Sequence, residues 1–179
     1  IGELYVWGSG DGGRLGLGSD QMRTHDKPTL VESLRHEIIQ DVSCGTSTTM
    51  VLTASKTIGS NSRTTVRRRT GGKLYVAGPK NVLGSAFPMF AELDYLKQNP
   101  LIIKSISAGY SHCSFVSEAG ELYCWGHNKG GCCGQDPTST TFITRPTKVP
   151  IYTAPRNLAL GRPCRLSSLY KDSQGLSAN

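Results

Sequence analysis

Long apolar segments and glycosylation motifs are both missing from this sequence. No uninterrupted apolar run approaches the roughly 18 residues that a membrane-spanning helix needs, and no signal peptide is visible at the start. Asn-x-Ser/Thr acceptors are also missing. The 13 acidic residues are scattered, and neither a paired-carboxylate site nor a nucleophile, base and orienting group is indicated. These absences argue against a membrane span and against an enzyme, and no cofactor is expected.

Internal repetition is the main feature that the sequence does contain. The string "GELYVWG" at 2–8 recurs as "GKLYVAG" at 72–78 and as "GELYCWG" at 120–126. The alternation in these strings predicts three equivalent β-strands, with the Leu and the residue two positions later on one face. The first and third copies stay in register well beyond the strand, at a constant offset of 118 residues.

Glycines follow the first and third strands at matching positions. In the first copy, "GSGDGG" at 8–13 has the spacing of a phosphate-binding loop, but no amphipathic helix follows it. The third copy replaces its middle glycine, Gly10, by Asn128. What repeats is therefore a turn whose backbone needs positive φ. We expect this structural role for Gly8, Gly12, Gly13, Gly16, Gly126, Gly130, Gly131 and Gly134.

A second repeated block locates an insertion. "IIQDVSCG" at 38–45 corresponds to "IIKSISAG" at 102–109, and each block is followed by a short polar turn and a new apolar strand. Gly2 and Gly72 are 70 residues apart, whereas Gly72 and Gly120 are 48 apart. Residues 54–73, here called the basic insertion, match nothing in the other copies and account for the excess.

Repeats of about fifty residues with short strands and Gly-rich turns are typical of β-propellers. The nearly complete string "AGYSHCSFVSEAGELYCWG" at 108–126, together with the turns at 8–17 and 126–134, resembles the regulator of chromosome condensation repeat. This resemblance covers residues 1–152 outside the insertion and implies an all-β partial propeller of about two and a half blades. That family closes a ring of seven blades, so we interpret the chain as a piece of a longer protein.

The same comparison of the repeated strings suggests where the repeats and the other segments of the chain begin and end. We expect a first propeller repeat at 1–53, a Ser/Thr/Gly-rich basic insertion at 54–71, a second repeat at 72–119 and the first half of a third at 120–152. Residues 153–179 would be a linker and the start of a discoidin-like or fucose-lectin-like β-sandwich, because "NLALGRPCRLSSLY" at 157–170 resembles its entry strand. The alternative is an extended segment that shares the string by chance.

The net charge of +7 is concentrated in the basic insertion. The 14 basic and 13 acidic residues elsewhere nearly balance. One interpretation is a solvated loop. The other is a tether for an acidic partner, such as nucleic acid, tubulin or an acidic protein face, bound without sequence readout. The candidate contacts are Lys56, Arg63, Arg67, Arg68, Arg69 and Lys73.

The cysteines bear on metal binding and on compartment. Cys124, Cys132 and Cys133 lie near His127 at spacings that zinc could use, but Cys124 stands where the first copy has Val6. Buried packing is therefore expected, and no metal. Six cysteines without a secretory signature favour a reduced intracellular setting, cytoplasmic or cytoskeletal, with the nucleus as an alternative.

Three functions remain open from the sequence. The first is a non-catalytic propeller scaffold for protein–protein interaction in a larger assembly. The second is guanine-nucleotide exchange on a small GTPase, which the resemblance suggests but which does not follow from shared blades. The third is carbohydrate binding, which depends on the C-terminal segment alone.

Overall fold

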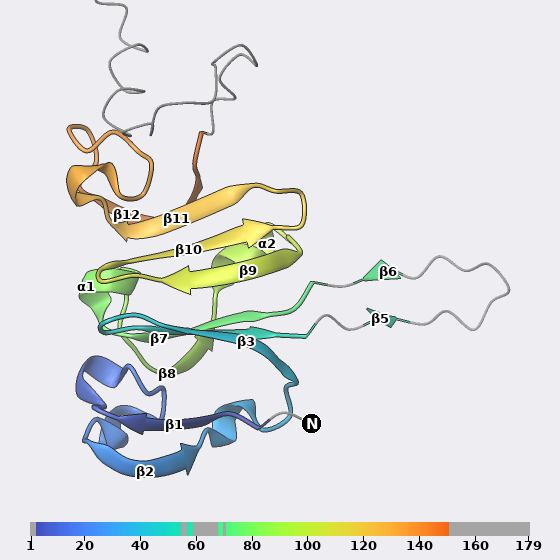
Figure 1. Ribbon diagram of the computed structural model, residues 1–179, viewed down its shortest axis with the longest axis vertical. Helices are drawn as coiled ribbons and strands as arrows, with labels where there is room; N and C mark the ends of the chain where they lie inside the picture. Colours follow the sequence, from blue (N-terminus) through green and yellow to red (C-terminus); the bar gives the residue numbers. More distant parts are fainter. Residues whose placement is uncertain (1–2, 55–56, 59–67, 70, 151–179) are drawn as a thin grey trace, which may run out of the picture.

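The computed structural model of this chain describes residues 3–54, 57–58, 68–69 and 71–150. Three antiparallel sheets lie one above another (Figure 1). The first contains β1 (Tyr5–Gly8) and β2 (His25–Leu30). The second contains β3 (Ile39–Cys44), β4 (Thr49–Thr53), β7 (Leu74–Gly78) and β8 (Phe87–Glu92). The third contains β9 (Ile103–Ala108), β10 (His112–Ser117), β11 (Leu122–His127) and β12 (Phe142–Lys148).

The predicted all-β partial propeller is confirmed. Besides the short pair β5 and β6, two sheets have four strands and one has two, so the described part of the chain amounts to two and a half blades. The segments 153–179 and most of the basic insertion lie outside the described residues, and the discoidin-like start at the C-terminal end stays a prediction.

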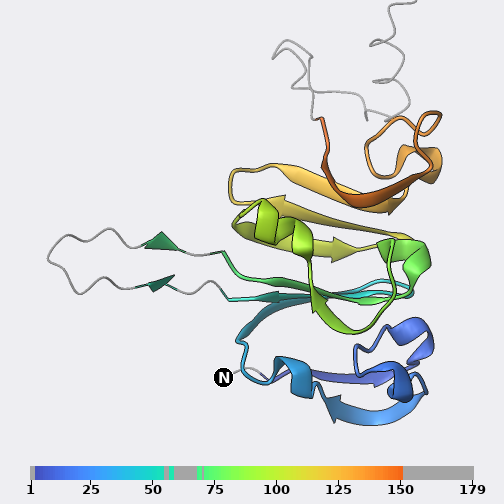
Figure 2. The same ribbon diagram turned by 180° about the vertical axis from the view of Figure 1, so that it is seen from behind.

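Helices are few and short in the described residues. Besides 3-10 turns at Asp11–Gly13, Ser19–Gln21, Glu32–Leu34 and Lys129–Gly131, there are α1 (Lys80–Leu83) and α2 (Asp94–Gln98). The view from behind brings both α-helices to the front (Figure 2). Helix α1 takes the place of the Gly-rich turn in the second repeat, and its Val82 and Leu83 are buried. An alternative local structure thus fills the same space between strands.

The three repeated strings form equivalent strands, as predicted. Strands β1, β7 and β11 each pair with the strand that follows them in the sheet, and each pairing is interrupted by a bulge just before the strand-end glycine. The bulges lie between Val6 and Gly8, between Val76 and Gly78, and between Cys124 and Gly126.

Each four-stranded sheet joins two sequence repeats. The second sheet takes β3 and β4 from the first repeat and β7 and β8 from the second, because β4 pairs with β7 across the basic insertion. The pairs Met50↔Val76 and Leu52↔Leu74 carry this junction, and all four side chains are buried. A blade is therefore offset from the sequence repeat by two strands.

Two apolar clusters fill the spaces between successive sheets. Side chains alternate across each strand, so the second sheet supplies both clusters. Leu4, Val6, Leu15, Val31, Leu34, Val51, Ala77 and Phe90 form the cluster shared by the first and second sheets. The larger cluster includes Leu74 and Val76 on one side and Phe115, Tyr123 and Trp125 on the other. Burial of each Val, Leu or Phe side chain in these clusters stabilises the fold by about 1.5 to 3 kcal/mol.

Candidate functional site

The structure describes a short two-stranded ribbon within the basic insertion. Strands β5 (Thr57–Ile58) and β6 (Arg68–Arg69) pair antiparallel, with Thr57 opposite Arg69 and Ile58 opposite Arg68. The ribbon extends away from the stacked sheets at the end where β4 stops and β7 begins (Figure 1). Lys56, Arg63 and Arg67 lie outside the described residues, and of Arg68 and Arg69 the structure describes the backbone.

Lys73, the last candidate contact, is held by the body of the protein. Its ammonium forms an ion pair with Glu37, with 2.9 Å between Nζ and Oε1. The Tyr75 hydroxyl donates to the same oxygen at 3.1 Å, and the Lys73 backbone N–H donates to Thr53 Oγ1 at 2.9 Å. The hydrogen bond with Glu37 raises the pKa of Lys73 well above its ordinary value. An acidic partner would therefore have to compete with Glu37 for this ammonium.

The Lys73 ion pair is one version of a recurring arrangement. The tyrosine of each repeated string donates its hydroxyl to a glutamate: Tyr5 to Glu3 at 2.8 Å, Tyr123 to Glu121 at 3.0 Å and Tyr75 to Glu37. In the second copy the position of that glutamate is occupied by Lys73, and Glu37 supplies the carboxylate instead. The pattern-based assignment missed Glu37. The charge reversal within the repeat was the signal that could have found it.

The glycine-rich turns use their own backbone N–H groups. All eight glycines expected in turns have positive φ, from 67° to 107°. Gly13 N–H donates to Gly10 at 3.0 Å and Gly16 N–H to Gly13 at 2.9 Å. In the third repeat Gly131 and Gly134 donate in the same way. Because these donors are already paired within the turn, they are not arranged as a cradle for phosphate.

Asn128 organises the long turn of the third repeat. Its side chain is fully buried, donates to the carbonyls of Gln135 at 3.0 Å and Thr140 at 2.8 Å, and accepts from the Cys133 backbone N–H at 3.1 Å. Gly10, its counterpart, has no room for this amide because an added Cβ would lie 2.4 Å from the Arg23 carbonyl oxygen. The two turns therefore share a shape but differ in what supports it.

Two of the three cysteines in the third repeat are buried packing residues. Cys124 and Cys133 are buried, and Cys132 is exposed. The thiols of Cys132 and Cys133 donate to the His127 carbonyl at 3.0 and 3.3 Å. The hydrogen bond with Cys124, followed by burial, raises the pKa of the Cys133 thiol. Within the described ranges, no group of three or more His, Cys, Asp and Glu side chains is placed to hold a metal ion.

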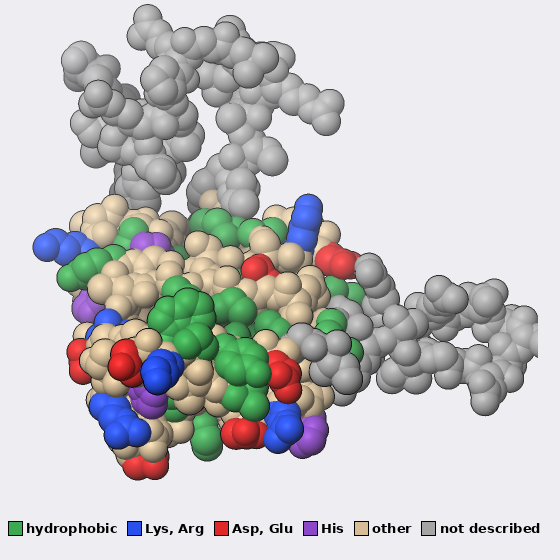
Figure 3. Space-filling model, turned by 60° about the horizontal axis from the view of Figure 1, so that its bottom comes forward, with side chains coloured by type: hydrophobic (Ala, Val, Ile, Leu, Met, Phe, Trp, Pro, Cys, Tyr) green, Lys and Arg blue, Asp and Glu red, His purple; other side chains and the backbone are tan. Residues whose placement is uncertain are grey.

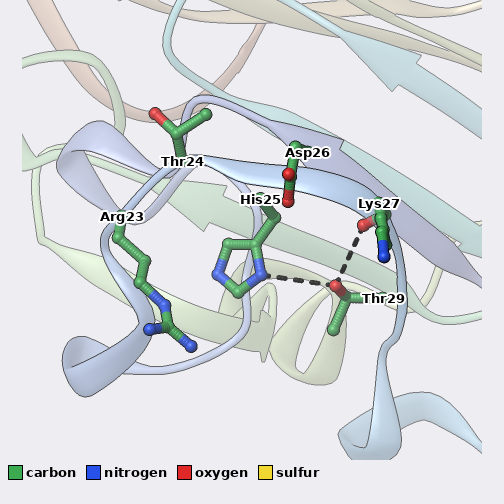
Figure 4. A pocket seen from close by; sticks show the side chains of 6 residues that line it. All are labelled: Arg23, Thr24, His25, Asp26, Lys27 and Thr29. Atoms are coloured by element: carbon green, nitrogen blue, oxygen red, sulfur yellow. Dashed lines mark hydrogen bonds between the residues drawn. The ribbon is translucent and has the colours of Figure 1, made fainter.

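A shallow hollow of about 290 Å³ lies beside β2. Arg23, Thr24, His25, Asp26, Lys27 and Thr29 line it (Figure 4). His25 Nε2 donates to the Gln21 carbonyl at 3.2 Å, and its Nδ1 lies 3.3 Å from Thr29 Oγ1. Both ring nitrogens are thus occupied by structural contacts, and the lining contains no nucleophile held by a base. Sequence pattern did not indicate this hollow.

Among the residues that the structure describes, no helix is long and apolar enough to cross a membrane. The two α-helices have four and five residues.

Comparison with known proteins identifies the repeats. Residues 2–52 match the family profile described as regulator of chromosome condensation (RCC1) repeat, and residues 103–135 match a second profile of the same description. The chain is 29% identical over 170 residues to the X-linked retinitis pigmentosa GTPase regulator of Canis lupus familiaris, covering 90% of this chain and 14% of that protein. It is 31% identical over 135 residues to a bifunctional serine/threonine-protein kinase/NEDD4-like E3 ubiquitin-protein ligase of Dictyostelium discoideum, covering 74% of this chain and 7% of that protein.

Solved structures show the same fold at lower identity. Human WBSCR16 superposes with a TM-score of 0.64 at 18% identity, covering 83% of this chain and 33% of that one. Yeast RCC1 (Prp20), in its complex with Kap60, superposes with a TM-score of 0.61 at 21% identity, covering 82% and 33%. This chain therefore spans a small part of its curated relatives and about a third of the solved propellers. The repeats, the sheets and these relatives agree that the chain is an RCC1-like repeat segment.

Proposed function

We propose that this chain is a non-catalytic propeller interaction module of a larger protein, and that its basic insertion contacts an acidic protein face. The observation that carries the proposal is that nearly all of the net positive charge lies in the basic insertion and not in the repeats that form the sheets. The insertion contributes six basic residues and no acid, whereas the rest of the chain is nearly neutral. An intracellular compartment, cytoplasmic, cytoskeletal or nuclear, is part of the proposal.

The ribbon geometry supports an interaction role for the insertion. Strands β4 and β7 pair directly with each other, so the blade is complete without the ribbon that leaves between them. Closing a longer loop costs little, because the entropy of closure grows only logarithmically with length. A function of the insertion is therefore separable from folding of the blade. Clustered Lys and Arg attract acidic surfaces without a specific shape, and salt weakens that attraction.

Replacing Arg67, Arg68 and Arg69 together by serine tests the proposal. Labelled poly-L-glutamate serves as the acidic probe, and anisotropy is measured at about 50 and 200 mM salt, where the screening length differs about twofold. We expect weaker binding at low salt and a shallower salt dependence for the variant. Its urea unfolding should match that of the wild type, since β4 and β7 pair directly with each other without the insertion.

A control variant separates the insertion from net charge. Lys27, Lys80 and Lys129 are exposed and lie outside the insertion, and replacing these three by serine changes the net charge equally. The control should keep most of the binding. Equal losses in both variants would show that overall charge, and not the insertion, attracts the probe, and would contradict the proposal.

Regulation of a small GTPase is a second candidate. Its support is that one relative is named a GTPase regulator and that a solved RCC1-fold structure, Prp20p, is described with its binding to Gsp1p and histones. Release of a fluorescent GDP analogue from a panel of small GTPases, measured with the full-length protein, tests it. An unchanged release rate across the panel would reject this candidate.

A further inference from the structure

The segment that lines the hollow beside β2 differs from its counterparts in the other two repeats. Opposite the strand-end glycine of each repeat lies one residue of the neighbouring strand, which is His25, Phe87 or Ile143. Around these positions, residues 23–29 read "RTHDKPT", whereas 85–91 read "SAFPMFA" and 141–147 read "TFITRPT". The first repeat thus places two cations, an acid and a histidine where the second has no charged residue.

Histidine takes the place of an apolar packing residue in this segment. Ile143 is buried, and Phe87 packs against the larger apolar cluster. The His25 ring is held by polar contacts instead. Its Nε2 lies 3.2 Å from the Gln21 carbonyl oxygen, and its Nδ1 lies 3.3 Å from Thr29 Oγ1. The ring is therefore a fixed wall of the hollow, and it ties the turn before β2 to the strand.

Three other side chains of the hollow have donors that are not in use. Within the described part of the chain, no hydrogen bond or ion pair engages the Arg23 guanidinium, the Thr24 hydroxyl or the Lys27 ammonium. All three residues are exposed. Figure 4 places Arg23 on one side of the His25 ring and Lys27 and Thr29 on the other. Free donors thus flank the ring on both sides.

The rim of the hollow is an exposed position of this fold, also in a sheet that has neighbours on both sides. The second sheet lies between the other two (Figure 1). There, Ser85 takes the place of Arg23 and is exposed, and Met89 takes the place of Lys27 and is 53% exposed. Figure 3 brings the first sheet forward and shows charged side chains around the margin of that face, with hydrophobic ones in its middle. A ligand can therefore reach the hollow from solvent.

An anion with several acceptor oxygens matches these donors. A guanidinium binds two oxygens at once, whereas an ammonium acts as a point charge. The hollow of about 290 Å³ lies at the small end of ligand sites, which typically measure about 300 to 1,000 Å³. Asp26 is the one acid in the lining, and it opposes any anion. A phosphate group overcomes this repulsion better than a carboxylate, because it has more acceptor oxygens and up to two charges.

We propose that Arg23, Thr24 and Lys27 bind a phosphate group in this hollow, either as inorganic phosphate or on a phosphorylated side chain of a partner protein. Arg23 binds two of the phosphate oxygens, Lys27 offsets the remaining charge, and the Thr24 hydroxyl donates to a further oxygen. His25 is a positioning residue, since its contacts with Gln21 and Thr29 hold the turn that carries Arg23 and Thr24.

Titration of the ¹⁵N-labelled chain with potassium phosphate tests the proposal. Amide resonances of residues 23–29 and the Nε–H resonance of Arg23 are followed by NMR, with potassium acetate at equal ionic strength as the comparison. We expect saturable shifts with phosphate and much weaker binding of acetate. Arg23→Gln should weaken phosphate binding about tenfold, because a charge-assisted contact to two oxygens is lost.

Two further variants act in opposite directions. Asp26→Asn should tighten phosphate binding about twofold or more, because a like charge is removed. His25→Phe, which introduces the residue of the second repeat, should weaken phosphate binding while the dispersion of the NMR spectrum shows a folded chain. Lys129→Gln is the control, because Lys129 is exposed and lies in the third repeat, so its loss should leave phosphate binding unchanged.

Blocked phosphothreonine and blocked threonine distinguish the two sources of phosphate. Tighter binding of blocked phosphothreonine than of inorganic phosphate, with none of blocked threonine, would support the proposal and identify a phosphorylated side chain as the ligand. Tighter binding of inorganic phosphate would support it with the free anion as the ligand.

Absence of saturable shifts, equal binding of acetate and phosphate, or equal affinity of Arg23→Gln and the wild type would overturn the proposal. The control variant of the acidic-partner test, which lacks Lys27, Lys80 and Lys129, should lose phosphate affinity but keep most of its binding to poly-L-glutamate. The arginine-to-serine variant of the basic insertion should show the reverse. Failure of the acidic-partner proposal and failure of this one are therefore distinguishable.

Discussion

Gly13 and Gly131 occupy the same turn position but meet different surroundings, so alanine at each site should have unequal effects. Gly13 has φ of 80° and Gly131 has φ of 74°. A left-handed backbone costs an L-residue about 1 to 2 kcal/mol at either site. At Gly13 the new Cβ would also lie 2.5 Å from the Pro88 Cα, whereas at Gly131 the nearest atom, Pro137 Cδ, would be 3.8 Å away.

The contact with Pro88 adds a second cost at Gly13 alone. Backbone cannot rotate away as a side chain can, and forcing extra atoms into packed space typically costs a further 1 to 3 kcal/mol or so. We therefore expect Gly13→Ala to lower the free energy of unfolding by about 2 to 5 kcal/mol and Gly131→Ala by about 1 to 2 kcal/mol. Urea unfolding of the same chain measures both, with equal m-values as the condition for comparison.

Gly130→Ala serves as the control for backbone strain alone. Gly130 has φ of 67°, and an added Cβ meets nothing within 4 Å. Its cost should equal that of Gly131→Ala. Equal losses at Gly13 and Gly131 would refute the reasoning, because they would show that the first sheet and β8 separate without cost when a methyl group is inserted between them.

The remaining predictions concern polar groups of the third repeat. Asn128→Ala should lower the free energy of unfolding by about 2 to 4 kcal/mol, because a fully buried side chain loses three hydrogen bonds; a loss below about 0.5 kcal/mol in urea unfolding would contradict this. The hydrogen bond from Lys148 at 2.6 Å, followed by that from Tyr123, lowers the pKa of Glu121. Its stabilising effect should therefore be complete above the unfolded pKa of about 4.3 and disappear as pH falls through the folded value. Carbon-detected NMR titration should show Lys148→Met raising the pKa of Glu121, and an unchanged pKa would exclude Lys148 as the cause.

Much of the fold could be read from local pattern. The strands at Tyr5–Gly8, Leu74–Gly78 and Leu122–His127 follow from side-chain alternation, which is set by the backbone of each strand alone. Positive φ at the turn glycines is also local, because it follows from the lack of a Cβ. Repetition made these local signals reliable, since the same string had to satisfy the same geometry in each copy.

The candidate site was less accessible to that reasoning. Counting charge along the chain grouped Lys73 with the basic insertion, but the structure pairs it with Glu37, 36 residues earlier. The hollow beside β2 had no sequence signal at all. The partner of Lys73 is distant in sequence, and the hollow depends on the conformation of a turn. Composition carries no information about long-range contacts or about turn conformation.

The sequence by itself determined the repeat, its strands, its turns and the concentration of charge in one segment, because each is a property of neighbouring residues. Only the tertiary structure decided that a blade straddles two repeats and that Lys73 belongs to the body. The reason is that strand pairing and burial are contacts between distant segments. The alternation along a strand predicts which face of the sheet a side chain lies on. Only the assembled sheets show whether another element covers that face.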